Sequence, residues 1–215
     1  IPNLVEEIEA LYRQGTRLFL FDDEQFLPPT RRARTERVQA LGDALKSRGL
    51  SIAFTIKSRA DDVDEALFRQ LKAMGLIRVY LGIESGCQAS LDRLGKGVTV
   101  AQNARALAVL DGLDIVADFH SLLFHPWSTL ETIRSDLEFL ARVLPLVPTP
   151  FTFHEVGCFP GTPLGEQLQA TAGQVGNLSY TSHEVGRFPG TPPGEQLRAT
   201  VGQAGTLPYT IADPG

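Results

Sequence analysis

Two hydrophobic periodicities alternate along the first 156 residues of the chain. Segments with apolar residues three or four positions apart, typical of amphipathic helices, alternate with short continuous apolar runs, typical of buried strands. Helices are predicted at 3–14, 38–45, 61–74, 100–110 and 129–142. Strands are predicted at 17–21, 50–56, 76–83, 115–124 and 150–156. This alternation is typical of βα units, whose strands form a parallel sheet through right-handed connections.

The predicted fold is therefore α/β, a partial (β/α) TIM-like barrel with about five parallel strands and outer helices. Residues 1–170 are assigned to this barrel. The remainder, 171–215, is a Gly- and Pro-rich tail that contains most of a repeat: 154–181 and 183–210 are identical at 21 of 28 positions. Two such similar copies indicate a tandem duplication, because a solenoid needs at least three stacking units.

Composition excludes several classes of protein. The net charge of −5 gives no global basic bias toward nucleic acid, and no apolar run reaches the length of a membrane span. Two cysteines give neither a disulfide framework nor a zinc spacing, which favours a cytoplasmic location. One basic cluster, residues 31–37, fits the solvated first turns of a helix, with a phosphate-binding patch as the alternative.

Polar residues follow the predicted strands. In a parallel barrel the functional groups gather at the carboxyl ends of the strands. Glu84 ends the strand 76–83, and a carboxylate at the end of a buried strand must find a partner. The other candidates at these ends are Asp22, Asp23, Glu24, Lys57, Arg59, Ser85, Asp118, His120, His125, His154 and Glu155.

Five segments together resemble the radical S-adenosylmethionine (SAM) superfamily, most closely its branch often fused to a cobalamin-binding domain. They are FLFDDEQF at 19–26, VYLGIESG at 79–86, LDRLGKG at 91–97, LLFHPWST at 122–129 and FPGTPL at 159–164. The resemblance covers residues 1–170 and implies strands two to six of a radical SAM core. SAM is the implied cofactor.

The resemblance also implies roles at the cofactor. Asp22 and Asp23 would approach the SAM amino group, where a carboxylate suits an ammonium. Glu84, with Ser85 beside it, would contact the ribose or the amino acid part. Lys96 would pair with the SAM carboxylate, or else be a solvated lysine at a helix end.

Further positions are assigned to the adenine and to the substrate. Leu123, Phe124 and Pro126 match the segment that flanks adenine in the family. Asp118, His120 and His154 would face the substrate, with a core or rim position as the alternative for the first two. The substrate itself is not identified.

The chain departs from the family at the iron–sulfur cluster. The family holds a [4Fe–4S] cluster with three cysteines in a CxxxCxxC loop, and reductive cleavage of SAM there gives the 5′-deoxyadenosyl radical. Here Cys87 and Cys158 are 71 residues apart. The expectation is a fragment that starts after the cluster loop, inactive without it, with any cobalamin-binding domain further upstream.

Two other hypotheses remain. A conventional metal or acid–base barrel enzyme would use Asp118, His120, His125 and Glu84, because oxygen and imidazole ligands hold divalent ions. A degenerate, non-catalytic barrel remnant is the second. An exposed edge at strand 17–21 also predicts self-association.

Overall fold

The structure, a computed structural model, describes residues 1–146, 152–155, 162, 163, 165 and 166. Residues 1–124 and 128–154 form one compact unit, and 125–127 with 155–215 are assigned to a second. The boundary predicted near residue 170, Cys158 and nearly all of both repeat copies lie outside the described residues.

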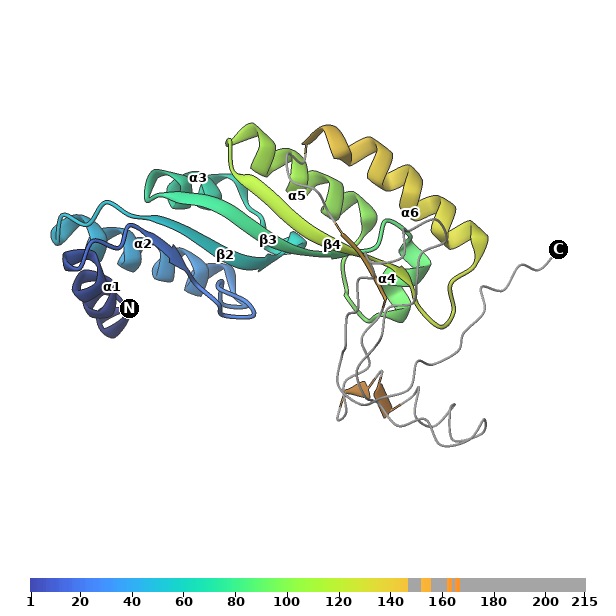
Figure 1. Cartoon of the computed structure of the whole chain (residues 1–215), viewed down its shortest axis with the longest axis horizontal. Coiled ribbons are helices and arrows are strands. Elements are labelled where there is room, and N and C mark those ends of the chain that lie inside the picture. Colours follow the sequence, from blue (N-terminus) through green and yellow to red (C-terminus); the bar gives the residue numbers. More distant parts are fainter. Residues whose placement is uncertain (147–151, 156–161, 164, 167–215) are drawn as a thin grey trace, which may run out of the picture. The chain divides into compact units, whose positions relative to one another are not determined.

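The predicted helices and strands of the first unit are present in the predicted order, with an additional helix at Gln88–Arg93 (Figure 1). Its strands are β1 (Leu18–Leu20), β2 (Ala53–Arg59), β3 (Leu76–Glu84), β4 (Val116–Phe124) and β5 (Thr152–Glu155, whose last residue is counted in the second unit). Its helices are α1 (Pro2–Arg13), α2 (Arg31–Ser47), α3 (Glu65–Ala73), α4 (Gln88–Arg93), α5 (Val100–Gly112) and α6 (Leu130–Val143), with 3₁₀ turns at Ala60–Asp62 and Leu144–Leu146.

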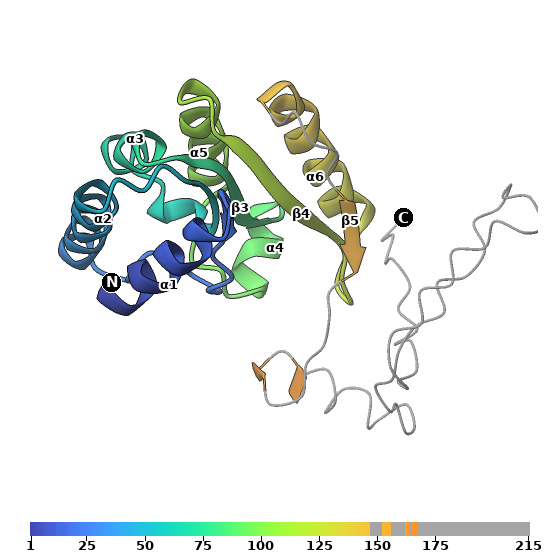
Figure 2. The same cartoon turned by 60° about the vertical axis from the view of Figure 1, so that its left-hand side comes forward.

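One sheet has the order β1-β2-β3-β4-β5, and the pairings β1–β2, β2–β3 and β3–β4 are parallel. Helices α2, α3, α5 and α6 form an arc around the strands (Figure 2). This arrangement confirms the predicted partial α/β barrel. Strand β1 is an edge of the sheet, with Leu20 72% exposed. Self-association through that edge stays a prediction.

Local signals set the element boundaries. Thr99 caps α5 and Thr129 caps α6, each in a reciprocal capping box. Gly75 ends the α3 segment in left-handed backbone (φ +108°), and a Cβ there would overlap the carbonyl oxygen of Ile52. Glycine is therefore required at this turn. Helix α4 was not among the predicted helices.

The two faces of the sheet differ in chemistry. In β2 and β4 burial alternates strictly, so every second side chain packs into the core. Core residues on this face include Phe54, Leu81 and Phe119, each 0% exposed. The other face carries half-buried side chains, and toward the carboxyl ends of the strands these become polar.

Candidate functional site

Seven residues on this second face form the candidate site, which we call the polar face: Lys57, Arg59, Tyr80, Gly82, Glu84, Asp118 and His120. Strand register places them side by side. Lys57 is paired with Tyr80, and Tyr80 with Asp118, across three adjacent strands. Arg59 is paired with Gly82. The alternation of strand side chains thus gathers polar and charged groups from a 64-residue stretch of sequence, 57–120, onto one surface.

Glu84 finds its partner in Lys96. The Lys96 Nζ donates to Glu84 Oε1 at 2.9 Å, and both side chains are about a quarter exposed. Glu84 has φ 61°, an uncommon conformation for a residue with a Cβ, next to an irregularity in the β3–β4 register. Lys96 lies between Gly95 and Gly97, both with φ 64°, in the loop between α4 and α5.

The loop that carries Lys96 meets the polar face at Arg59, Gly82 and Glu84. A Cβ at Gly82 would lie 3.2 Å from Lys96 Nζ and 3.4 Å from Glu84 Oε1, so the missing side chain makes room for the pair. Arg59 fixes the loop by donating to the Lys96 carbonyl oxygen at 2.7 Å. The Asp61 carboxylate accepts two bonds from Arg59, at 2.9 and 3.2 Å, and raises the pKa of its guanidinium.

Asp22 and Asp23 lie beyond the end of β1. Lys57 Nζ is 2.8 Å from Asp22 Oδ1 and 3.3 Å from Glu24 Oε1. The hydrogen bond to Lys57 lowers the pKa of Asp22, and the same bond raises the pKa of Lys57. Asp23 pairs instead with Arg37 of α2, at 3.7 Å. The structure therefore brings Asp22 to the polar face and turns Asp23 toward α2.

Tyr80 and His120 form a hydrogen-bonded pair across β3 and β4. The Tyr80 hydroxyl is 2.6 Å from His120 Nδ1, and the rings meet edge to face. Burial, followed by the charges of Glu84 and Asp118, raises the pKa of Tyr80 to about 12. The hydroxyl thus keeps its proton at neutral pH, and the direction of its hydrogen bond with Nδ1 follows the tautomer of the imidazole. Asp118 lies 3.5 Å from Arg78.

The Ser85 side chain points toward helix α6, whereas the Glu84 side chain points toward Lys96. It is 1% exposed, and its hydroxyl donates to Asp136 Oδ1 of α6 at 2.6 Å. Its placement supports the turn, so the structure gives the predicted cofactor contact of Ser85 no support. Sequence reasoning missed Asp136 and Asn103, both fully buried. Their signal is a polar residue at an inward-facing position of a helix.

The remaining predicted residues lie in both units or outside the described part of the chain. Leu123 is 6% exposed on the core side of β4, and Phe124 is half-buried at its end. Pro126 and His125 belong to the second unit. The side chain of His154 lies outside the described part of the chain. No group of three or more potential metal ligands occurs among the described residues, so the metal hypothesis gains no support there.

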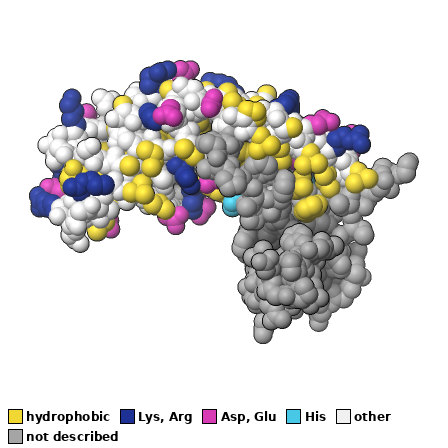
Figure 3. All heavy atoms as spheres, turned by 45° about the horizontal axis from the view of Figure 1, so that its top comes forward, with side chains coloured by type: hydrophobic (Ala, Val, Ile, Leu, Met, Phe, Trp, Pro, Cys, Tyr) yellow, Lys and Arg dark blue, Asp and Glu magenta, His cyan; other side chains and the backbone are white. Residues whose placement is uncertain are grey.

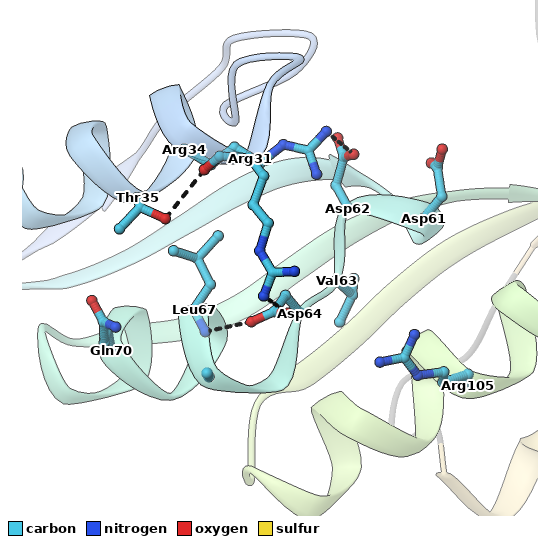
Figure 4. A pocket seen from close by; sticks show the side chains of 11 residues that line it. Arg31, Arg34, Thr35, Asp61, Asp62, Val63, Asp64, Leu67, Gln70 and Arg105 are labelled. Carbon is cyan, nitrogen blue, oxygen red and sulfur yellow. Dashed lines mark hydrogen bonds and ion pairs between the residues drawn. The ribbon is translucent and has the colours of Figure 1, made fainter.

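The basic cluster at 31–37 is paired with carboxylates. Arg31 lies 3.6 Å from Asp64, Arg32 bonds Glu36, and Arg34 pairs with Asp62, which is 3% exposed. Burial raises the pKa of Asp62 despite that arginine. A hollow of about 330 Å³ is lined by Arg31, Arg34, Asp62 and Asp64, with Arg105 at its far side (Figure 4). Its walls carry both charges, which favours a solvated helix end over a phosphate site.

The face of the molecule drawn in Figure 3 carries charges of both signs. Lysine and arginine side chains are interspersed with aspartate and glutamate on the face drawn in Figure 3, without a basic patch. Within the described residues, no helix has both the length and the apolar character needed to cross a bilayer.

Comparison with known proteins finds curated relatives that match most of the chain. The chain is 28% identical over 167 residues to an uncharacterized methyltransferase of Pyrococcus horikoshii, covering 77% of the chain and 35% of the relative. It is 30% identical over 166 residues to the anaerobic magnesium-protoporphyrin IX monomethyl ester cyclase of Rubrivivax gelatinosus, covering 72% and 29%. The chain thus spans about a third of the length of these relatives. No protein-family profile matches it.

Solved structures agree on the fold. The apo form of OxsB, a cobalamin-dependent SAM radical enzyme, superposes with a TM-score of 0.69 at 18% identity, covering 93% of the chain and 34% of OxsB. The radical SAM methyltransferase TsrM of Kitasatospora setae, with cobalamin and a [4Fe–4S] cluster bound, gives 0.65 at 20% identity, covering 79% and 33%.

Proposed function

We propose that this chain is part of a radical SAM enzyme and that its polar face binds S-adenosylmethionine, a proposal supported by its relatives and by the fold it shares with OxsB and TsrM. The observation that carries the proposal is the Glu84–Lys96 pair over Gly82. The two side chains present a carboxylate and an ammonium side by side at the carboxyl end of a parallel strand. A zwitterionic amino acid group carries the complementary pair of charges.

Each charge has a defined partner in this arrangement. Lys96 would bind the SAM carboxylate, a charge-assisted contact. Glu84 would accept from the ribose hydroxyls or the ammonium, and Asp22, held by Lys57, would accept from the ammonium. Arg59 holds the Lys96 loop in place through the Lys96 carbonyl oxygen, so it supports the site without contacting the ligand.

The cysteines of these 215 residues do not fit an iron–sulfur cluster. A cluster that keeps one iron open for SAM needs three thiolate ligands, and the sequence holds two cysteines. No cleavage of SAM is therefore assigned to these residues. The proposed role is to hold and orient SAM within a radical SAM enzyme, with the substrate and the reaction left to the whole protein.

Titration of the isotope-labelled chain with SAM, followed by NMR, tests this proposal. We expect shifts at the amides of Gly82, Glu84 and Lys96. Glu84→Gln removes one charge at nearly constant shape and should weaken SAM binding at least about tenfold, because a charge-assisted hydrogen bond is worth about 1.5–3 kcal/mol. The matched control is Glu131→Gln, an exposed glutamate in the first turn of α6.

Two results would overturn the proposal. One is the absence of any shift at these three amides at SAM concentrations up to about 5 mM. The other is equal SAM affinity for Glu84→Gln and Glu131→Gln. Adenosine and methionine, titrated separately, tell which half of SAM each amide senses.

A further inference from the structure

Buried side chains from two helices, α5 and α6, form hydrogen bonds with the turn that carries Glu84. Asn103 of α5 donates both of its amide hydrogens to the main chain, to the carbonyl oxygens of Ile83 at 3.1 Å and Ser85 at 3.2 Å. These two carbonyls flank Glu84 on either side. Asn103 is 0% exposed, so these bonds are shielded from water.

Asp136 of α6 binds Ser85 and Gly86, the next two residues of the same turn. Its Oδ1 accepts from the Ser85 hydroxyl at 2.6 Å and from the Gly86 amide at 2.5 Å. The Ser85 hydroxyl oxygen in turn accepts from the Cys87 amide at 3.0 Å. Asp136 is 1% exposed. A Cβ at Gly86 would overlap the Phe139 side chain, which keeps the turn pressed against α6.

Burying polar side chains such as Asn103 and Asp136 costs folding free energy wherever their polar atoms lack hydrogen-bond partners. Asp136 Oδ2 and Asn103 Oδ1 are buried without a hydrogen-bond partner among the described residues. An apolar side chain of the same size would avoid that cost. What the two residues do secure is the backbone on both sides of Glu84, which has the uncommon φ of 61°.

We propose that Asn103 and Asp136 are positioning residues that hold the 83–87 turn so that the Glu84 carboxylate is presented beside Lys96. We call the hydrogen bonds of these two residues with the turn the clamp. Its importance for SAM binding rests on the proposed function, whereas the clamp itself does not. Neither residue touches the polar face. They act through Ser85, Gly86 and the carbonyls of the turn, so their loss should free the turn while leaving the rest of β3 intact.

Amide hydrogen exchange on the full chain, without ligand, measures the clamp directly. Asp136→Leu keeps the approximate volume and removes the acceptor, whereas Asp136→Asn keeps one acceptor oxygen. We expect exchange at Gly86 and Cys87 to rise at least about tenfold in Asp136→Leu, with Val79 and Leu81 within about threefold of the parent. Asp136→Asn should restore slow exchange. Asp111→Leu, at an exposed position of α5, is the control.

SAM affinity is the second readout. If the proposed function holds, Asp136→Leu should bind SAM at least about tenfold more weakly, and Asp136→Asn within about threefold of the parent. If the parent does not bind SAM, the proposed function fails, but the exchange data still decide the clamp.

Three outcomes would overturn the clamp. One is unchanged exchange at Gly86 and Cys87 in Asp136→Leu. Another is equal exchange in Asp136→Leu and Asp136→Asn, which would show that the acceptor is irrelevant. If Asp136→Leu does not fold, Ser85→Ala replaces it, since it removes the hydroxyl between Asp136 and the Cys87 amide. Unchanged exchange at Cys87 in that variant would also refute the proposal.

Discussion

The pair of Glu84 and Lys96 can be tested for its own stability by a double-mutant cycle. Lys96→Met and Glu84→Gln are made singly and together, because each removes a charge and keeps most of the side-chain volume. The cycle isolates the coupling between the two side chains from the separate cost of each substitution.

The structure sets the size of this coupling. At a separation of 2.9 Å the Coulomb attraction is about 1 kcal/mol in water and several kcal/mol in a protein-like dielectric. Both side chains are about a quarter exposed, so water and lost side-chain freedom reduce the net value. We expect a coupling of about 1 kcal/mol, which corresponds to about 2–4 °C in the melting temperature of a chain this size.

Urea unfolding of the four proteins at neutral pH gives the coupling free energy. Added salt should reduce it only in part, because a partly buried pair is screened less than a surface pair. A coupling below about 0.2 kcal/mol would show that the ion pair is not formed in solution, and the reasoning that assigns Lys96 to the polar face would fail. Arg32 and Glu36, an exposed pair at 2.7 Å on α2, provide the comparison.

Three other experiments test the rest of the structure. Burial raises the pKa of Asp136 in the folded state. The contribution of Asp136 to stability is therefore complete below the ordinary aspartate pKa and is lost as pH rises through the raised value. Measured against pH, the free energy of unfolding of Asp136→Asn should rise relative to that of the parent across that window, and the difference should be constant outside it. Gly75→Ala adds a Cβ in left-handed backbone against a carbonyl and should cost about 3 kcal/mol in urea unfolding, whereas a cost below about 1 kcal/mol would contradict that turn geometry. Arg34→Met leaves the Asp62 carboxylate buried and should cost about 3 kcal/mol, with at least about 1 kcal/mol recovered when Asp62→Asn is added; full additivity of the two costs would contradict the pairing.

The sheet could be predicted from the sequence because its signal is local. Each strand is a short apolar run, and each helix repeats apolar residues along one side. The predicted strand 50–56 nevertheless ended too early, since β2 continues to Arg59. Lys57 and Arg59 are charged, but they alternate with the buried Ser58 and lie on the half-buried face. Helix α4 is six residues long, too short for a periodic pattern to show.

The sequence predicts which segments form the site, but it does not predict in which direction their side chains point. The segment around Glu84 and the segment around Lys96 were both assigned to the site, but only the fold shows that the two side chains bond each other. Asp136 lies 50 residues from Gly86 in sequence, and no local pattern relates them. Ser85 adjoins Glu84, yet strand geometry turns its hydroxyl to the helices.

The pairing of charges on the polar face limits what can bind there. Lys57 is matched by Asp22 and Lys96 by Glu84, so an ion of either sign alone would leave one member of a pair without its partner. A group with both charges can pair with both members at once, which keeps every charge compensated. If the proposed function holds, we therefore expect the polar face to prefer zwitterions over simple anions or cations, a condition that the amino acid end of SAM satisfies and its adenosine end alone does not.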